Sequence, residues 1–185
     1  MILEEVVANP FLEQFYRSGM KDALPAQLFF LFQRAKQLGA IRQSDLFASV
    51  RVADFHLHKD QLFAELVLGR DEYALYRQVA DTLDLDVPQP DLTIYLQAPA
   101  GDLHNRIARR DGPFDRMLDR AYLERVADAY ARYYHDYDES PLLIVNTSSI
   151  DPVRSDADFE ALFEQVQRIS GGRHFYNPVA AVALA

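Results

Sequence analysis

The sequence contains no cysteine and no tryptophan. Without thiols the chain has neither disulfides nor thiolate metal sites, as is common for cytoplasmic proteins. No run of about 18 apolar residues occurs, so we expect no membrane-spanning helix. The N-terminal segment, Met1–Glu5, also lacks the basic stretch and apolar run of a signal peptide. We therefore expect a cytoplasmic protein that does not bind a membrane.

Lysine is scarce too, because 16 of the 19 basic residues are arginines. The net charge of −9 would repel a phosphate-rich polymer on average, so we expect no binding to nucleic acid. A small phosphorylated ligand needs only a local basic cluster, and the forked guanidinium group of arginine suits phosphate oxygens. A high GC content of the coding DNA would produce the same excess of arginine, and this alternative stays open.

The hydrophobic pattern predicts strands and helices in alternation. The predicted strands span Ile2–Val7, Phe47–Ala53, Asp91–Gln97 and Leu142–Val145. The predicted helices cover Phe11–Tyr16, Leu24–Leu38 with Gly39 as its stop, Lys59–Leu68, Glu72–Leu83, Gly101–Arg110, Ala121–Tyr137 and a helix capped at Ser155. This alternation favours an α/β fold, with a parallel sheet between helices. We predict one domain over residues 1–172, without a boundary at its prolines, and a loose tail over residues 173–185.

Acidic residues stand at the ends of two predicted strands. Glu4 and Glu5 belong to the first strand and Asp54 follows the second. Ligands of such sheets bind at the carboxyl ends of the strands, where a carboxylate can accept a proton from a hydroxyl or hold a metal ion. Solvated acids at strand ends produce the same pattern, so these residues are candidates only.

A basic cluster surrounds the Asp-Gly-Pro loop at residues 111–113. It comprises Arg106, Arg109, Arg110 and Arg116. Arg106 and Arg110 are four residues apart and therefore share one helical face. Arginines beside a loop can stabilise a phosphoryl group during its transfer. An ordinary helix end also attracts cations through the helix dipole, and that alternative remains.

The third candidate group is aromatic and amide-bearing. It consists of Tyr16, Gln27, Phe30 and Arg34. Gln27 and Arg34 are seven residues apart, two turns along one face of the same predicted helix. An amide can pair with the edge of a nucleobase, as glutamine does with adenine. A partly exposed helix side would look the same.

Five segments, in order, resemble bacterial deoxynucleoside kinases of the deoxyadenosine/deoxyguanosine type. They are LEEVVANPFLEQFY, LPAQLFFLFQR, VADFHLHKDQLFAE, PDLTIYLQAPAGDLHNRIARR and YLERVADAYARYYHDYDESPLLIVN. The resemblance runs to about Asn146 and continues more loosely through the last helix. It implies a P-loop kinase-like, three-layer α/β/α fold. It also implies a homodimer and transfer of the ATP γ-phosphate, with Mg²⁺, to the 5'-hydroxyl of a purine deoxynucleoside.

The resemblance also implies roles for individual residues. Glu5 matches the general base that deprotonates the 5'-hydroxyl. The residues that match substrate contacts are Tyr16 and Asp115 for the sugar 3'-hydroxyl, and Gln27, Arg34 and Asp60 for the base. Those that match phosphate or magnesium contacts are Arg106, Arg110 and, for the metal, Asp54. The chain departs from the family at Val6, where a proline is usual, and after Asp54, where Phe55 and His56 replace an Arg-Ser pair.

Family members begin with a strand, a G-x-x-x-x-G-K-[ST] phosphate-binding loop and a helix. The first glycine here is Gly19, and no lysine follows a glycine in that pattern. Roughly 30 residues of a βαβ unit are thus expected to be absent. A start codon placed too late, a fragment and a degenerate kinase are the open explanations. We expect little or no kinase activity from the chain as written, which an assay beside a version extended upstream would test.

Two other functions remain open. One is a nucleotide kinase of the thymidylate type, and the other is a noncatalytic chain that binds a nucleoside or forms dimers. The kinase hypothesis requires Glu5, Gln27 and Arg106 to surround one pocket.

Overall fold

The computed structural model describes residues 3–4, 6–19, 21–43, 50–56, 58–83, 85, 88–110, 112 and 114–178, without the side chains of residues 40–43 and 116. The chain forms two compact units, and each is described by itself. The first comprises Met1–Pro88 with Arg116–Leu118, and the second comprises Gln89–Asp115 with Asp119–Ala185. The division follows Pro88, in the proline-containing stretch where the sequence analysis placed no boundary.

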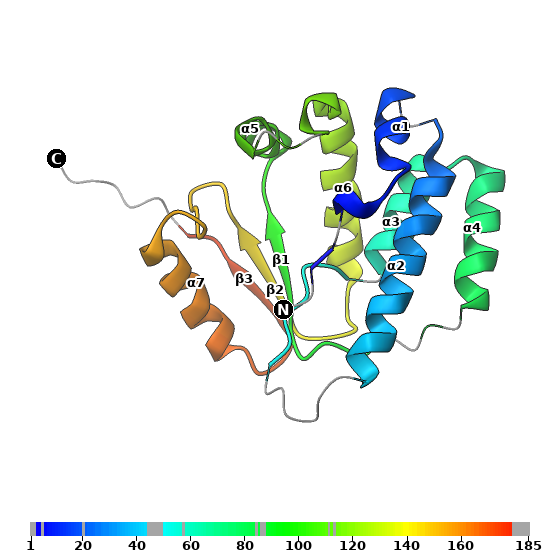
Figure 1. The fold of residues 1–185 in the computed structure, drawn as a ribbon. Helices are drawn as coiled ribbons and strands as arrows, with labels where there is room; N and C mark the ends of the chain where they lie inside the picture. The colour runs from blue at the N-terminus through cyan, green and yellow to red at the C-terminus, as the bar shows by residue number, and fades with distance from the viewer. Residues whose placement is uncertain are drawn as a thin grey trace. The chain divides into compact units, whose positions relative to one another are not determined.

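Helices dominate the first unit (Figure 1). They are the 3₁₀ helix η1 (Val6–Ala8) and the α-helices α1 (Leu12–Arg17), α2 (Ala23–Gln43), α3 (His58–Val67) and α4 (Arg70–Thr82). Helix α2 packs against the other three α-helices. Leu31 of α2, Ala64 of α3 and Tyr76 of α4 form a buried cluster between them, because the long helix directs its apolar side chains toward both neighbours.

Local signals explain where several of these helices begin and end. Gly19 has a positive φ of 66°, the left-handed conformation that commonly follows the last turn of a helix, and α1 ends at Arg17, one residue beyond the predicted end at Tyr16. The side chain of Glu72 accepts a hydrogen bond from the amide of Gly69 at the start of α4. The expected stop at Gly39 was wrong, because α2 continues to Gln43. Glycine within a helix costs only about 1 kcal/mol relative to alanine, and helix-forming residues on both sides outweigh that cost.

Two strands predicted for this unit are not observed among its described residues. Residues 6–8 of the first form η1 instead. Of the second, residues 50–53 are described and only Ala53 makes an isolated bridge. A strand is stabilised by hydrogen bonds to a neighbouring strand, and the described part of these segments lacks such a ladder.

The second unit contains a three-stranded parallel sheet in the order β1 (Thr93–Gln97), β2 (Leu142–Asn146) and β3 (Arg173–Tyr176). Thr93 lies opposite Leu142, which lies opposite Arg173 on its other side. Helices α5 (Ala100–Arg110) and α6 (Arg120–Asp136) connect β1 to β2, and α7 (Asp156–Arg168) connects β2 to β3; the 3₁₀ helix η2 spans Asp115–Met117. The tail expected to be loose from residue 173 therefore begins with a strand, and residues 179–185 lie outside the described residues.

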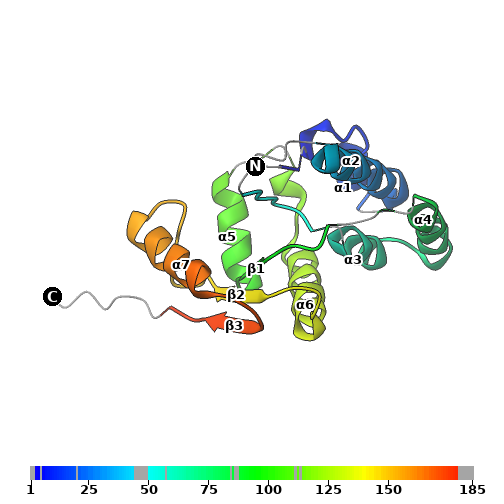
Figure 2. The same ribbon diagram turned by 90° about the horizontal axis from the view of Figure 1, so that it is seen from below.

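Helices cover both faces of this sheet (Figure 2). On one face, α6 packs a tyrosine cluster against β1 and β2; its members are Tyr95, Tyr130, Tyr133, Tyr134 and Tyr137. On the other face, α7 covers Leu143 and Val145. Side chains alternate between the faces of a strand, so β2 can contribute to both layers. The predicted parallel sheet between two helical layers is thus confirmed.

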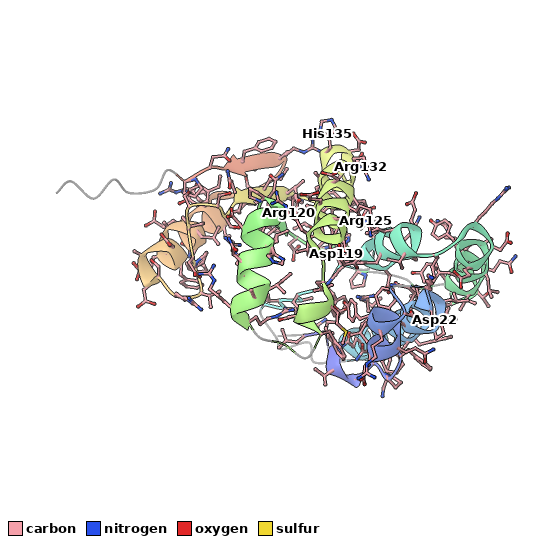
Figure 3. All side chains as sticks on the ribbon, turned by 90° about the horizontal axis from the view of Figure 1, so that it is seen from above. Asp22, Asp119, Arg120, Arg125, Arg132 and His135 are labelled. Carbon is pink, nitrogen blue, oxygen red and sulfur yellow. The ribbon has the colours of Figure 1, made fainter. Side chains whose placement is uncertain are left out.

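The outer side of α6 is polar. Figure 3 shows Arg120, Arg125, Arg132 and His135 along this helix, which starts after Asp119. The carboxylate of Asp119 accepts a hydrogen bond of 2.6 Å from the amide of Tyr122 and so caps the helix.

Replacing Asp119 with alanine is expected to lower the free energy of unfolding by about 1 kcal/mol, because the first turn of α6 loses its cap. Urea unfolding followed by circular dichroism measures this. The matched control is Asp128→Ala, an exposed acid in the middle of the same helix. That change should leave stability equal or slightly higher, since alanine favours a helix interior. Equal losses in the two variants would contradict the capping role.

In the part of the chain that the structure describes, no helix has the length and apolar character needed to cross a membrane.

Candidate functional site

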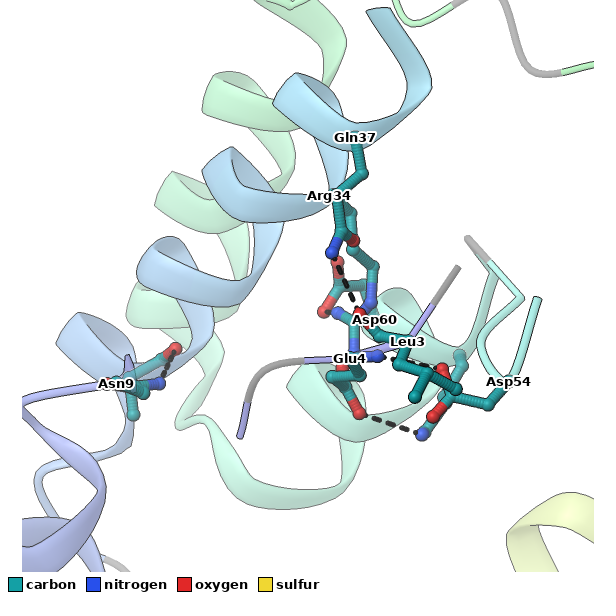
Figure 4. Close-up of polar contacts among 9 residues, drawn as sticks. Leu3, Glu4, Asn9, Arg34, Gln37, Asp54 and Asp60 are labelled. Carbon is teal, nitrogen blue, oxygen red and sulfur yellow. Dashed lines mark hydrogen bonds and ion pairs between the residues drawn. The ribbon is translucent and has the colours of Figure 1, made fainter. Parts of the chain in front are cut away.

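Arg34 is the centre of a buried polar cluster in the first unit (Figure 4). Its Nη1 donates to Oδ1 of Asp60 and its Nη2 donates to Oε1 of Glu4. Arg34 is only 3% exposed. The planar guanidinium group presents donors in a fixed fork, so one arginine can hold two carboxylates from different segments.

Further contacts fix the segment that carries Glu4. Lys59 Nζ lies 3.2 Å from Glu4 Oε2, so each oxygen of this carboxylate faces a cation. The amide of Glu4 donates to Asp54 Oδ1 at 2.8 Å. Gln37 Nε2 donates to the carbonyl oxygen of Leu3 at 3.0 Å. Helix α2, helix α3 and the segment at Asp54 together hold the chain at residues 3–4.

Acceptor atoms without a hydrogen-bond partner among the described residues of this unit include Oε1 of Gln27, Oε1 of Gln37 and Oδ2 of Asp60. Gln37 is half-buried, whereas Gln27 and Asp60 are buried, at 5% and 2% exposed. A buried polar atom without a partner costs about 1–3 kcal/mol. Such a cost is typical of a site whose ligand supplies the missing donors. Gln27 lies on α2, two turns before Arg34, as the sequence spacing predicted.

Tyr16 lies on α1, which packs against α2. It is half-buried, and its ring centroid lies 4.9 Å from that of Phe15. Phe30 and Phe55 flank the guanidinium group of Arg34, with centroids 5.4 and 5.9 Å from its Cζ. Phe30 of the predicted group therefore packs against the arginine together with Phe55, which adds cation–π attraction to its two ion pairs.

In the second unit, hydrogen bonds hold the side chain of Arg106 at the carboxyl end of the sheet. It donates from Nη1 to Thr147 Oγ1 at 2.9 Å and from Nη2 to the carbonyl oxygen of Thr147 at 2.5 Å. The hydroxyl of Thr147 donates to the carbonyl oxygen of Gln97 at 3.0 Å. Because Gln97 ends β1 and Thr147 follows β2, this arrangement places Arg106 at the edge where parallel α/β sheets bind ligands.

Arg110 and Asp115 form a second ion pair in this unit. Nε of Arg110 donates to Asp115 Oδ2 at 2.9 Å and Nη2 donates to Oδ1 at 2.5 Å. The amide of Gly112 also donates to Oδ2, at 2.8 Å. The hydrogen bond from Arg110 lowers the pKa of Asp115 below its ordinary value, with a smaller contribution from Gly112. The carboxylate is therefore ionised at neutral pH.

The sequence model of the family described as deoxynucleoside kinase matches residues 1–170. The chain is 31% identical over 176 residues to a deoxyguanosine kinase of Bacillus subtilis (strain 168), covering 91% of this chain and 84% of that protein. It is 24% identical over 175 residues to a deoxyadenosine/deoxycytidine kinase of the same organism, covering 90% and 79%. The chain belongs to the deoxynucleoside kinase family. Members of this family are ATP-dependent phosphotransferases, as the resemblance implied.

Solved structures of a deoxyadenosine kinase from M. mycoides share the fold of the present chain. One, with the products dCMP and dCDP bound, superimposes with a TM-score of 0.75 at 20% identity and covers 91% of this chain and 87% of that one. Another, with bound dATP, gives a TM-score of 0.73 at 22% identity and covers 89% and 84%. They confirm the predicted P-loop kinase-like architecture.

The structure brings some of the predicted residues of this deoxynucleoside kinase together. Arg34 contacts Asp60 in the first unit, and Arg110 contacts Asp115 in the second. Glu5, the predicted base, lies outside the described residues, as does the side chain of Arg116.

The sequence pattern marked Glu4 only as one of the candidate acids at strand ends, and it indicated no role for Lys59 or Thr147. Glu4 and Lys59 contact each other from segments 55 residues apart, which no spacing rule connects. Thr147 could have been found, because it lies two residues after the predicted strand Leu142–Val145, at the ligand-binding edge of the sheet.

Proposed function

We propose that the phosphoryl acceptor of this kinase is a purine deoxynucleoside, whose base is bound by Gln27, Arg34 and Asp60. The observation that carries the proposal is the pair of buried acceptors without partners, Gln27 Oε1 and Asp60 Oδ2. Both call for hydrogen-bond donors from a ligand. Adenine offers an exocyclic amino group, and guanine offers a ring N–H beside an amino group.

Arg34 orients the carboxylate of Asp60 for contact with the base. Its bond to Oδ1 fixes the carboxylate of Asp60 and leaves Oδ2 as the acceptor for a base. Thymine has one ring N–H and no amino group, so it would satisfy at most one of the two acceptors. A base that leaves a buried polar group unpaired is rejected strongly. The relatives named as deoxyguanosine and deoxyadenosine/deoxycytidine kinases fit this preference for amino-bearing bases.

The general base of the reaction comes from the Glu4–Glu5 pair. The sequence predicts Glu5, whereas the contacts favour Glu4, because its carboxylate shares Arg34 with the base-binding residue Asp60. A carboxylate in this position would take the proton of the 5'-hydroxyl as the oxygen attacks the γ-phosphate. Contacts to the sugar 3'-hydroxyl are proposed for Tyr16 of the first unit and, separately, for Asp115 of the second, as the family resemblance implies.

The phosphate donor is ATP, and Arg106 and Arg110 would bind its phosphates. Asp54 accepts the hydrogen bond from the amide of Glu4 through Oδ1, and its other carboxylate oxygen would hold the magnesium ion that accompanies ATP. A hard cation such as Mg²⁺ prefers carboxylate oxygens. Magnesium would neutralise charge on the transferring phosphoryl group. We also propose a cytoplasmic homodimer without affinity for nucleic acid.

Isothermal calorimetry with deoxyguanosine, deoxyadenosine, thymidine and thymidine monophosphate tests the acceptor class. We expect binding of the purine deoxynucleosides at least about tenfold tighter than that of the two thymine compounds. Tighter binding of thymidine monophosphate would favour a thymidylate-type kinase instead. Nucleoside binding without any binding of ATP or turnover would favour a noncatalytic binding chain.

Replacing Gln27 with leucine should separate ligand binding from stability. Leucine removes the unpaired acceptor, so the free energy of unfolding should stay equal or rise. The affinity for deoxyguanosine or deoxyadenosine should fall roughly 10- to 100-fold, the value of a bidentate contact to a base. Gln14→Leu, at an exposed position of α1, is the control and should leave the affinity unchanged. Unchanged affinity in Gln27→Leu would remove this residue from the site.

A further inference from the structure

The carboxylate of Asp115, the first residue of η2, contacts the C-terminal end of α5. It accepts hydrogen bonds from Nε and Nη2 of Arg110 and from the amide of Gly112. The Asp115 side chain is 5% exposed, whereas that of Arg110 is 68% exposed. The ion pair thus joins a buried carboxylate to a guanidinium group on a largely exposed side chain.

Gly112 makes this arrangement possible. A Cβ atom at this position would lie 2.7 Å from Asp115 Oδ2 and 3.0 Å from its Cγ and Oδ1. Such approaches are shorter than van der Waals contact, so a side chain here would push the carboxylate away. Any residue other than glycine at position 112 would therefore require the Asp115 carboxylate to shift from this place.

The bidentate geometry has a chemical consequence. The donors that Arg110 directs at Asp115 have the spacing with which arginine binds two oxygens of one phosphate group. A phosphate bound in this way would have to replace the carboxylate, because both ligands need the same N–H groups.

We propose that Asp115 is an internal competitor for the phosphate site at Arg110 and sets the phosphate affinity of that site. The proposal rests on the proposed role of Arg110 in phosphate binding. Phosphate binding would release the Asp115 carboxylate, which is then available to a second ligand group such as a sugar hydroxyl.

Calorimetry of the whole chain with inorganic pyrophosphate tests this competition without requiring catalysis. Asp115→Asn should tighten pyrophosphate binding about three- to tenfold, since the neutral amide holds the guanidinium group more weakly. Gly112→Ala should tighten it about twofold or more without any change of charge, because it displaces the carboxylate. The double variant Asp115→Asn with Arg110→Gln should lose the gain.

Asp102→Asn is the matched control. It removes one negative charge from the first turn of the same helix, α5, at a residue eight positions before Arg110. If it tightens pyrophosphate binding as much as Asp115→Asn does, the effect is general electrostatics and the proposal is wrong. Unchanged affinity in both Asp115→Asn and Gly112→Ala, or no pyrophosphate binding by any variant, also overturns it. Purine deoxynucleoside binding, measured separately, shows whether the proposed acceptor site stands when this inference fails.

Discussion

Replacing Arg34 with methionine should lower the free energy of unfolding by about 3–5 kcal/mol, because it leaves the buried carboxylate of Asp60 and the partly buried carboxylate of Glu4 without their shared cation. Glu4 and Asp60 both contact this guanidinium group, and Glu4 would retain only Lys59. Methionine keeps much of the volume of the side chain, so the loss reflects charge more than a cavity. Urea unfolding of the whole chain, followed by far-ultraviolet circular dichroism, measures it.

Arg17→Met is the control for this prediction. Arg17 also pairs with a glutamate, Glu13, at 2.6 Å, but both side chains are exposed. An exposed pair contributes about 0–1 kcal/mol, so the change should be small. A loss below about 1 kcal/mol in Arg34→Met would mean that the two acids are not held as buried ions. Arg34→Lys should give an intermediate loss, since one ammonium group cannot reproduce the fork.

Replacing Glu4 with glutamine should reduce the rate of phosphoryl transfer by about 10²- to 10⁴-fold, the usual contribution of a positioned general base. The amide keeps the shape of the carboxylate but cannot accept the proton of the 5'-hydroxyl. The rate should be measured in single turnovers at saturating deoxynucleoside. It should be measured on whichever form phosphorylates deoxynucleosides, the 185-residue chain or one extended upstream.

Glu5→Gln is the matched comparison, because it makes the same chemical change at the neighbouring residue. If Glu4 is the base, Glu5→Gln should retain most of the rate. The reverse result would support the sequence-based prediction of Glu5. Similar small losses in both variants would exclude either carboxylate as the base. Unchanged nucleoside affinity in Glu4→Gln would separate a chemical role from disruption of Arg34.

Elements with strong local signals could be predicted from the sequence. The aliphatic run after Pro141 predicted β2, and Ser155, whose hydroxyl accepts from the amide of Asp158, predicted the start of α7. Elements that depend on a distant partner could not be predicted. β3 is a short, exposed strand after Gly171 and Gly172, and it is defined by its pairing with β2 rather than by its own composition.

The same distinction applies to the candidate site. Helical spacing placed Gln27 and Arg34 on one side of α2, and the structure confirms that both lie on this helix and are buried. Helical spacing could not show that Arg34 contacts both Glu4, 30 residues earlier, and Asp60, 26 residues later, with a single guanidinium group. Such contacts follow from tertiary packing, so the choice between Glu4 and Glu5 became visible only in the structure.

The tyrosine cluster of α6 and β1 gives the second unit an optical signal, beside that of the stacked pair Tyr73 and Tyr76 in the first unit. Ring centroids of Tyr95 and Tyr134 lie 4.5 Å apart, and those of Tyr95 and Tyr130 lie 6.0 Å apart. The chain has no tryptophan to mask them. Aromatic rings held in fixed orientations give near-ultraviolet circular dichroism that vanishes when packing loosens. Loss of contact between α6 and the sheet can therefore be followed in the unlabelled protein.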